Sequence, residues 1–281
     1  MPSQPPPARL TVRFWGVRGS IPTPEAGFLG VGGNTACVEV RAADGSALVL
    51  DAGTGLRALG YALAAEAAGE PTETHLALTH FHWDHLQGLP FFAPLYTPGQ
   101  TVRFYAATDD ERLHRLLRGQ MCPPYFPVPF ADVAASTETV RVTDGEPFAV
   151  GSMTVRPFPL FHPQGAHGYV IEADGARAVY ATDYEHGSAT HDAGLLEVAR
   201  GADLLISDAQ YTPDEYALRV GWGHTTWEHA ADLAAEAGVG TLVLFHHDPS
   251  HDDAAMGRIG DLAIGRFPAT LVASEGLEIR L

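Results

Sequence analysis

A cluster of polar side chains directly after an apolar segment is the feature that most constrains this chain. Residues 75–88 read HLALTHFHWDHLQG, and the first part is typical of a buried strand. His80 and His82 alternate with Phe81, so both histidines are expected to point to one side of the chain. Buried polar groups need partners, and imidazoles that converge with a carboxylate suit zinc, iron or manganese. The segment therefore predicts a metal site at a strand end.

The number of candidate ligands indicates more than one ion. Four potential ligands lie within six residues, namely His80, His82, Asp84 and His85. Four such groups this close together rarely all serve one ion, so two adjacent ions are expected. Other strand-like segments also end in side chains that bind metals: Asp51, His162, Asp183, His246 and His247.

Strand-like and helical patterns recur along the whole chain. The strand-like segments lie at 10–17, 37–42, 47–53, 75–80, 101–106, 153–160, 168–173, 178–183, 203–209, 241–247 and 270–281. Helical patterns lie at about 56–69, 108–118, 190–200, 226–237 and 252–265. Short turns predict antiparallel pairing of the early strands, and the later strands alternate with helices. This order predicts an α/β protein with layered sheets flanked by helices.

Composition narrows the classes of function. The 281 residues are 46% hydrophobic and 18% charged, and no apolar run approaches the roughly 20 residues that span a membrane. We expect a cytoplasmic protein with a disordered lead-in at 1–9, because no basic segment precedes an apolar one there. The two cysteines fit a reducing compartment. A net charge of −17 argues against broad binding of nucleic acids.

The segment THFHWDH resembles the HxHxDH signature of the metallo-β-lactamase superfamily. An earlier aspartate (Asp51), later histidines and a later aspartate follow the order of that superfamily. The resemblance extends over nearly the whole chain, from FWGVRGSIPTP and GGNTACVEV to LFHHDPSHDD. It implies a four-layer αββα sandwich, with residues 10–281 as a single domain and a dinuclear site at one edge.

Within the superfamily, the chain is most similar to the branch of RNase Z and the phosphoribosyl cyclic phosphodiesterases. In that branch a metal-binding histidine is followed six and seven residues later by Gly-Tyr, and here His162 precedes Gly168 and Tyr169. The branch also carries an acidic residue followed by a GHST-like stretch. Here these are Asp208 in SDAQY and His224 in GWGHTT.

The resemblance implies a ligand set for two divalent ions. By this resemblance one ion is bound by His80, His82 and His162. The other is bound by Asp84, His85 and His246, and Asp183 bridges the two. His246 is favoured over His247, and Asp51 is expected to orient the histidine loop rather than to bind metal. Zinc is the favoured ion, with manganese or iron as alternatives.

The expected chemistry is hydrolysis by a hydroxide held between the two ions, which lower the pKa of bound water. The catalytic residues are then Asp84, His224 and Asp208. His224 is expected to donate a proton to the leaving alkoxide, and Asp208 to orient His224. The alternative for His224 is a structural role beside the N-cap of the helix in HTTWEHAADLAAEAG.

Two departures from the branch bear on the substrate. RNase Z has a long tRNA-gripping arm, but here only a hairpin-like segment of twenty residues separates His162 from Asp183. The cysteine-rich zinc segment of the phosphoribosyl enzyme is also missing. We therefore expect small or cyclic phosphodiesters as substrates and no structured nucleic acid or membrane as partner. A homodimer is compatible with the sequence.

Alternative functions remain open. They are a lactone or thioester hydrolase, an RNase Z-like nuclease without the arm, a diiron redox protein and a non-catalytic nucleotide sensor. Four residues have open roles as well. For Arg18 and Asn34 a structural turn role is favoured over contact with a phosphate, whereas His167 and His186 could line the pocket. The proline–aromatic segment at 121–130 is expected to be an ordered loop, either at the surface or as a pocket wall.

Overall fold

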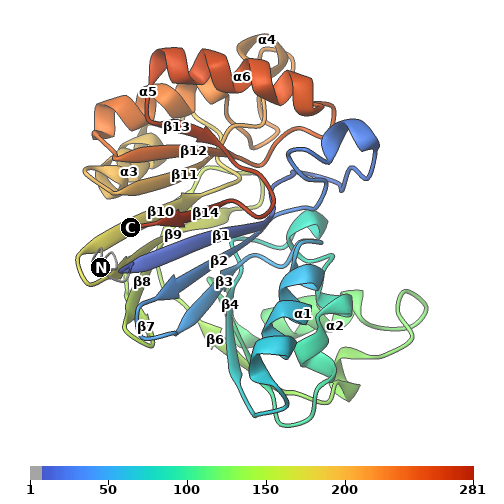
Figure 1. Cartoon of the computed structure of the whole chain (residues 1–281). Coiled ribbons are helices and arrows are strands. Elements are labelled where there is room, and N and C mark those ends of the chain that lie inside the picture. Colours follow the sequence, from blue (N-terminus) through green and yellow to red (C-terminus); the bar gives the residue numbers. More distant parts are fainter. Residues whose placement is uncertain (1–7) are drawn as a thin grey trace, which may run out of the picture.

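Two seven-stranded sheets packed face to face form the centre of the molecule (Figure 1). The structure is a computed structural model that describes residues 8–281. Residues 1–7 of the expected lead-in therefore lie outside the described residues. The strand order is β14-β1-β2-β3-β4-β5-β6 in the first sheet and β13-β12-β11-β10-β9-β8-β7 in the second.

The strands of both sheets are short and mostly buried. The first sheet contains β1 (Leu10–Gly16), β2 (Cys37–Ala42), β3 (Ala47–Leu50), β4 (Glu73–Ala77), β5 (Thr101–Ala106), β6 (Ser136–Arg141) and β14 (Glu278–Arg280). The second contains β7 (Phe148–Val150), β8 (Met153–Leu160), β9 (Ala166–Ala173), β10 (Ala176–Ala181), β11 (Leu204–Asp208), β12 (Thr241–Phe245) and β13 (Thr270–Val272).

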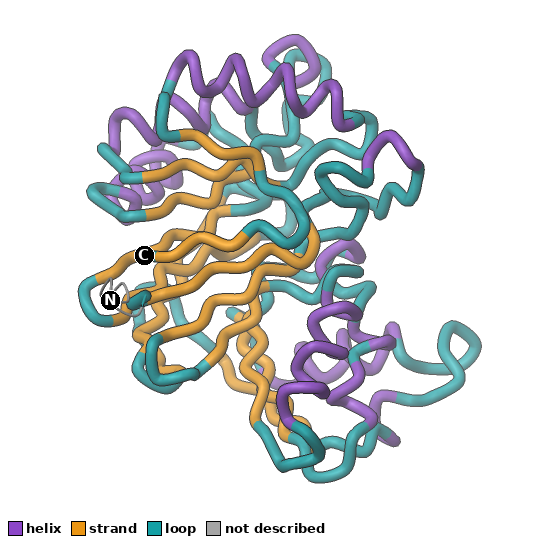
Figure 2. Tube along the Cα trace, viewed as in Figure 1, coloured by secondary structure: helices purple, strands orange, loops and turns teal. Residues whose placement is uncertain are grey.

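Helices cover the outer face of each sheet and complete four layers (Figure 2). The helices α1 (Leu56–Ala67) and α2 (Asp110–Gln120) cover the first sheet, and α3 (Ala189–Ala199), α5 (Trp227–Ala237) and α6 (Asp253–Arg266) cover the second. Apolar residues of both sheets form the central core, and each helical layer has a core of its own. This is the αββα sandwich that the resemblance to the metallo-β-lactamase superfamily implies.

Most predicted elements are found close to their expected positions. The early strands β1, β2 and β3 pair antiparallel, as predicted from their short turns. The segment 270–281 was expected to be one strand, but its two halves join different sheets as β13 and β14, because a turn with Gly276 at φ +84° separates them. Strands β6 and β7 and the short helix α4 (Pro213–Tyr216) are not among the predicted elements.

Parallel pairing determines where the polar strand ends meet. Strand β3 runs parallel to β4 in the first sheet, and β10, β11 and β12 run parallel to one another in the second. The carboxyl ends of parallel strands lie at the same edge of a sheet, where binding sites form in layered α/β proteins. The residues after these five strands therefore gather at one edge of the sandwich.

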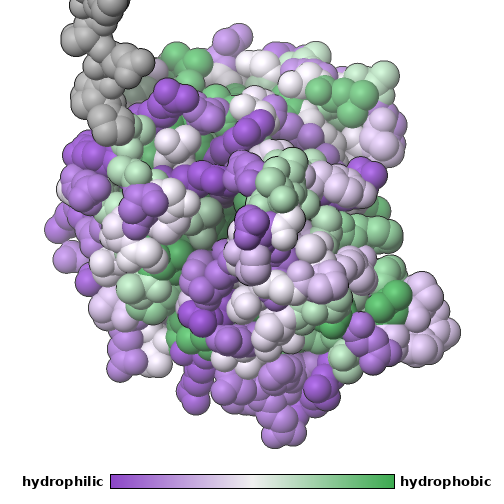
Figure 3. Space-filling model, turned by 60° about the horizontal axis from the view of Figure 1, so that its bottom comes forward, coloured by the Kyte–Doolittle hydropathy of each residue, from purple (hydrophilic) through white to green (hydrophobic). Residues whose placement is uncertain are grey.

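Polar and apolar side chains are mixed on the face of the molecule that Figure 3 presents. Figure 3 shows hydrophilic side chains over much of one face, with hydrophobic ones in smaller patches between them. Among the residues that the structure describes, no helix has the length and apolar character needed to cross a membrane.

Candidate metal centre

Three site residues adopt a backbone conformation that is unusual for their type. Asp51, Asp183 and His246 follow β3, β10 and β12, and their φ angles are +62°, +56° and +60°. Each left-handed residue of this kind costs on the order of 1–3 kcal/mol and persists only where the surroundings hold it. The shared conformation turns each chain sharply at the strand end and directs the side chain into the edge site.

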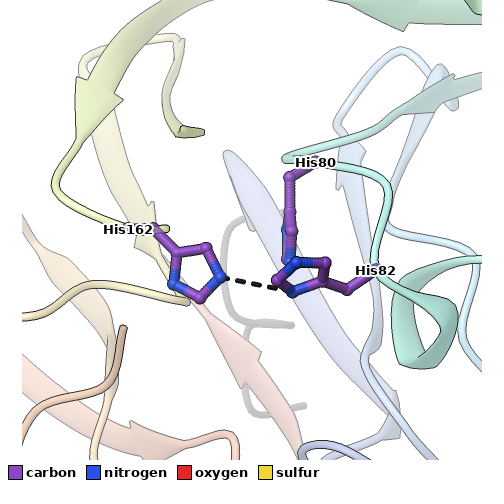
Figure 4. A group of neighbouring side chains, drawn as sticks. All are labelled: His80, His82 and His162. Atoms are coloured by element: carbon purple, nitrogen blue, oxygen red, sulfur yellow. Dashed lines mark hydrogen bonds between the residues drawn. The ribbon is translucent and has the colours of Figure 1, made fainter. Parts of the chain in front are cut away.

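The first group of candidate ligands consists of His80, His82 and His162, whose ring nitrogens lie within 4.8 Å of one another (Figure 4). His162 Nε2 lies 3.3 Å from His82 Nδ1. The opposite nitrogen of His162 donates to the carbonyl oxygen of Gly223 at 2.8 Å, and His80 Nδ1 contacts Thr79 Oγ1 at 3.0 Å. These bonds fix the two rings and leave Nε2 of each facing the group.

The second group consists of Asp84, His85, Asp183 and His246, all buried. His246 Nε2 lies 3.2 Å from Asp84 Oδ2 and 3.3 Å from Asp183 Oδ2, and His85 Nε2 lies 3.1 Å from the same Asp183 oxygen. The other Asp183 oxygen lies 3.7 Å from His80 Nε2 in the first group. Asp183 thus presents one oxygen to each group.

Asp51 and Gln210 hold the second group in place. Asp51 Oδ2 lies 2.9 Å from His85 Nδ1, and the Asp51 carboxylate also accepts the backbone N–H of Thr79 at 2.9 Å. Asp51 thus lies beside His85 and outside both groups of candidate ligands. Gln210 Oε1 accepts from His246 Nδ1 at 2.9 Å. Nothing in the local sequence around Thr79, Gln210 or Gly223 marks these residues as supports for a ligand.

The neighbouring residue His247 is directed away from the site. Its Nε2 donates to the carbonyl oxygen of Ala273 at 2.9 Å, and burial lowers its pKa to about 3. Arg18 is also fully buried and donates to the carbonyl oxygens of Gly32 and His251 at 2.7 and 2.6 Å. The side-chain amide of Asn34 donates a hydrogen bond to the Glu275 carboxylate at 3.1 Å. The contacts of Arg18 and Asn34 are those of turn-stabilising residues.

The carboxylates and histidines of the second group shift the pKa values of one another. Burial alone would favour neutral carboxyl groups, but His85 and His246 hold the pKa of Asp84 well below its ordinary value. Burial likewise opposes the charged form of His246, yet Asp183 and Asp84 raise its pKa to about 9. Two buried carboxylates thus require positive charge beside them, which either protonated histidines or a cation can supply.

The donor set fits a divalent metal. Among residues 8–281, no hydrogen-bond partner is found for the buried His80 Nε2, although His80 Nδ1 is engaged. Burial lowers the pKa of both His80 and His162, which keeps these rings in the neutral form that binds metals. Imidazole nitrogens and carboxylate oxygens at this spacing suit zinc and similar ions.

A histidine–aspartate pair adjoins both groups. His224 Nδ1 donates to Asp208 Oδ2 at 2.8 Å and lies 3.9 Å from Asp183 Oδ1. Asp208 Oδ1 accepts the backbone N–H groups of Gln210 and Thr225 at 3.1 and 3.0 Å, so the carboxylate is fixed on both sides. The structure therefore brings the two residues predicted as proton donor and orienting group into direct contact.

The two remaining histidines of open role lie beside the site rather than in either group. His167 Nε2 lies 2.9 Å from Asp144 Oδ1. His186 Nδ1 contacts Thr225 Oγ1 at 2.7 Å, and its ring stacks on that of His229 with centroids 4.3 Å apart. These contacts give both side chains a structural explanation.

Replacing Gly223 should weaken metal binding without touching a ligand. Gly223 has φ +92°, and a Cβ there would lie 2.2 Å from His162 Nδ1. We expect Gly223→Ala to displace His162 and to reduce metal affinity by roughly 10- to 100-fold, as is typical when the support of a ligand is lost. Chelator competition on purified protein measures the affinity.

Gly221→Ala is the matched control. Gly221 has φ +89°, so alanine brings the same backbone strain, but its Cβ would face open space. Both glycine N–H groups donate to the Glu185 carboxylate. Equal metal affinity in the two variants would contradict the role given to Gly223.

Comparison with known proteins agrees with this geometry. Residues 47–247 match the sequence profile of the beta-lactamase superfamily domain. Ribonuclease Z of Synechococcus sp. (strain WH7803) is 29% identical, and the match covers 72% of this chain and 77% of that protein. The uncharacterized protein ML1173 of Mycobacterium leprae is 32% identical over 75% of this chain and 70% of its own length.

A solved structure shows the same fold. The metallo-beta-lactamase fold protein YhfI from Bacillus subtilis superimposes with a TM-score of 0.72 at 20% identity, covering 97% of this chain and 99% of that one. Fold, sequence profile and the buried histidine–aspartate groups agree with one another. The chain belongs to the metallo-β-lactamase superfamily, in the branch that contains RNase Z, and is a metal-dependent hydrolase.

Proposed function

We propose that this protein is a phosphodiesterase that uses two divalent metal ions, with zinc favoured, to hydrolyse small or cyclic phosphodiesters. The observation that carries the proposal is the His224–Asp208 pair, whose 2.8 Å bond adjoins both groups of candidate ligands. A proton donor in this position is most useful for a reaction that expels a poorly stabilised alkoxide.

The seven candidate ligands divide naturally between two ions. One group has three imidazoles, the other has two imidazoles and Asp84, and Asp183 presents an oxygen to each. Seven ligands exceed the four of a single tetrahedral zinc site. When bound, two such ions supply an activated water and neutralise charge that develops on phosphoryl oxygens.

The residues of the chain then orient the substrate and move the proton. His224 lines a hollow of about 510 Å³ together with Ser20, Tyr211, Arg219, Trp222 and Asp248. The guanidinium of Arg219 lies over the ring of Tyr211, 5.2 Å from its centroid, and can contact a phosphate oxygen there. His224 Nδ1 forms a hydrogen bond with the Asp208 carboxylate. The other ring nitrogen, Nε2, is therefore free to donate a proton to the leaving oxygen of the substrate.

The short β9–β10 hairpin and the net negative charge both favour a small substrate. Strands β9 and β10 pair directly, with Ala173 opposite Ala176, so no arm is inserted between His162 and Asp183. The net charge of −17 repels a polyanion over roughly a Debye length, about 8–10 Å at physiological salt.

An RNase Z-like nuclease is the second candidate. The observation that favours it is the similarity to ribonuclease Z from Synechococcus, which stands in mild conflict with the expectation that structured nucleic acid is not a partner. The two candidates share the same metal chemistry and differ only in how the rest of the substrate is held.

A direct comparison of substrates tests the proposal. We expect bis-p-nitrophenyl phosphate and cyclic nucleotides to be hydrolysed with a kcat/KM at least about tenfold above that for a precursor tRNA or for a panel of lactones. The assays use one preparation whose zinc or manganese content is measured. Efficient cleavage of the tRNA at its 3′ end, with little turnover of small diesters, would establish the second candidate instead.

A further inference from the structure

A single buried carboxylate joins three segments that carry parts of the candidate metal centre. Glu185 lies two residues after Asp183, beyond the end of β10, and is only 3% exposed. Its backbone N–H donates to the carbonyl oxygen of Phe161, the residue before His162, at 2.8 Å. Its side chain contacts the segment 216–223. Glu185 therefore links the ends of β8 and β10 to a segment that lies elsewhere in the sequence.

Three hydrogen-bond donors hold the Glu185 carboxylate. Its Oε1 accepts from the backbone N–H of Gly221 at 2.6 Å and from the hydroxyl of Tyr216 at 3.2 Å. Its Oε2 accepts from the backbone N–H of Gly223 at 2.7 Å. Both glycines are left-handed, with φ angles of +89° and +92°, and backbone N–H groups that converge in this way form a site for an anion. The carboxylate thus fixes the course of the segment.

The bond to Gly223 matters because the same glycine supports a candidate metal ligand. The carbonyl oxygen of Gly223 accepts from His162 Nδ1 at 2.8 Å, while Glu185 holds the N–H of Gly223. A displacement of Gly223 would move its carbonyl oxygen and, with it, the ring whose Nε2 faces the first group of candidate ligands.

We infer that Glu185 is a positioning residue for the first metal ion, and that it acts through Gly223 on His162. The inference rests on the proposed dinuclear centre and assigns it a residue that belongs to neither group of candidate ligands. Among residues 8–281, the Glu185 side chain forms hydrogen bonds only with the segment 216–223 and none with the second group. The first ion should therefore depend on Glu185, and the second should not.

Two carboxylates fix opposite ends of the short stretch that leads into α5. Asp208 contacts His224 Nδ1 at 2.8 Å and accepts the backbone N–H of Thr225 at 3.0 Å, whereas Glu185 accepts that of Gly223. Asp208 thus holds the proposed proton donor, and Glu185 holds the support of a metal ligand. Loss of the Glu185 carboxylate should appear in metal affinity.

Zinc titration of the full-length protein tests the inference. Glu185→Gln replaces one acceptor oxygen by an amide nitrogen that cannot accept, so one glycine N–H loses its partner. We expect the affinity for one of the two ions to fall by about tenfold, the lower end of the range for loss of an outer support. The other ion should bind as in the wild type. A general loss of folded structure would weaken both ions together.

Asp44→Asn is the matched control. Asp44 also accepts from two backbone N–H groups with one oxygen each, those of Ser46 at 2.9 Å and Ser152 at 2.8 Å. It lies in the turn before β3, at the opposite end of that strand from Asp51. This variant should bind both ions like the wild type. Equal metal affinities for Glu185→Gln and Asp44→Asn, or equal weakening of both ions by Glu185→Gln, would overturn the inference.

A double-mutant cycle shows whether Glu185 acts through Gly223. Gly223→Ala alone is expected to reduce metal affinity by roughly 10- to 100-fold. Adding Glu185→Gln should lower the affinity little further, because both changes remove the same support of His162. If the two effects multiply instead, Glu185 acts by another route and the inference is wrong.

NMR of the histidine side chains keeps this test apart from the proposed function. The Nδ1–H of His162, which donates to Gly223, should give a slowly exchanging signal that is assigned by its loss in His162→Gln. Glu185→Gln should shift or broaden this signal and leave that of His247 Nε2–H, which donates to Ala273, unchanged.

The two measurements can fail separately. If the wild-type protein binds fewer than two ions, the proposed dinuclear centre fails, while the His162 signal still decides whether Glu185 positions that ring. Glu185→Asp, which keeps the charge on a side chain one methylene shorter, is measured in the same way if Glu185→Gln does not fold. A His162 signal that is unchanged in the folded variant would overturn the inference.

Discussion

Asp183→Ala is expected to abolish the proposed dinuclear centre and to lower kcat/KM by about 10³-fold or more. Asp183 is almost fully buried and directs one oxygen to each group of ligands, at 3.1 Å from His85 Nε2 and 3.7 Å from His80 Nε2. Loss of an ion removes several kcal/mol of charge stabilisation in the transition state, and 1.36 kcal/mol corresponds to a factor of about ten.

Metal analysis is the primary measurement for Asp183→Ala. We expect wild-type protein to contain two ions per chain under metal-replete conditions and the variant to contain at most one. Asp203→Asn serves as control, because Asp203 accepts from the Arg177 backbone N–H away from the ligand groups. A variant that keeps two ions and most of its activity would refute the bridging role.

The same centre should lose metal on acidification. The carboxylates Asp183 and Asp84 raise the pKa of His246 to about 9 in the metal-free protein. Below that pH the ring holds a proton that an incoming ion must displace, so the affinity for metal falls as the pH is lowered.

The site could be predicted best where metal-binding side chains directly follow a segment with the pattern of a buried strand. His80 and His85 follow an apolar strand, so their burial and their need for a partner could both be anticipated. Strand ends such as Asp51 and Asp183 were harder to interpret individually. They converge because β3 and β10 each belong to a parallel pair whose carboxyl ends lie at the site edge.

Other parts of the site and fold could not be predicted, because they depend on backbone conformation or on contacts between residues far apart in the sequence. His246 and His247 are adjacent and chemically identical, yet only His246 adopts φ +60° and faces the ligands. Gly223 supports His162 from sixty-one residues away in sequence. Strand β6 is polar and half-exposed, so it lacks the apolar alternation by which the other strands were predicted.

The largest effect outside the metal ligands is expected at His224. His224→Ala should retain its metal. His224 also lies within 4.8 Å of candidate ligands such as His162 and Asp183, but the two groups assigned to the ions are complete without this ring. The variant should nevertheless lower kcat by roughly 10²- to 10⁴-fold on diesters with an alkoxide leaving group, which is the usual contribution of a general acid. The Asp208 carboxylate, 2.8 Å from His224 Nδ1, keeps Nε2 pointed towards the hollow that the substrate would occupy.

The dependence on the leaving group distinguishes proton donation from a structural role. p-Nitrophenolate leaves without a proton, so His224→Ala should slow a p-nitrophenyl diester far less than a cyclic nucleotide. Asp208→Asn should show the same pattern more weakly, since it alters the orientation and charge of the donor. His191→Ala, a histidine outside every ligand group, is the control for loss of an imidazole and should match the wild type. An equal loss on both kinds of leaving group, or a loss of less than about tenfold on the cyclic nucleotide with full metal content, would show that His224 does not donate the proton.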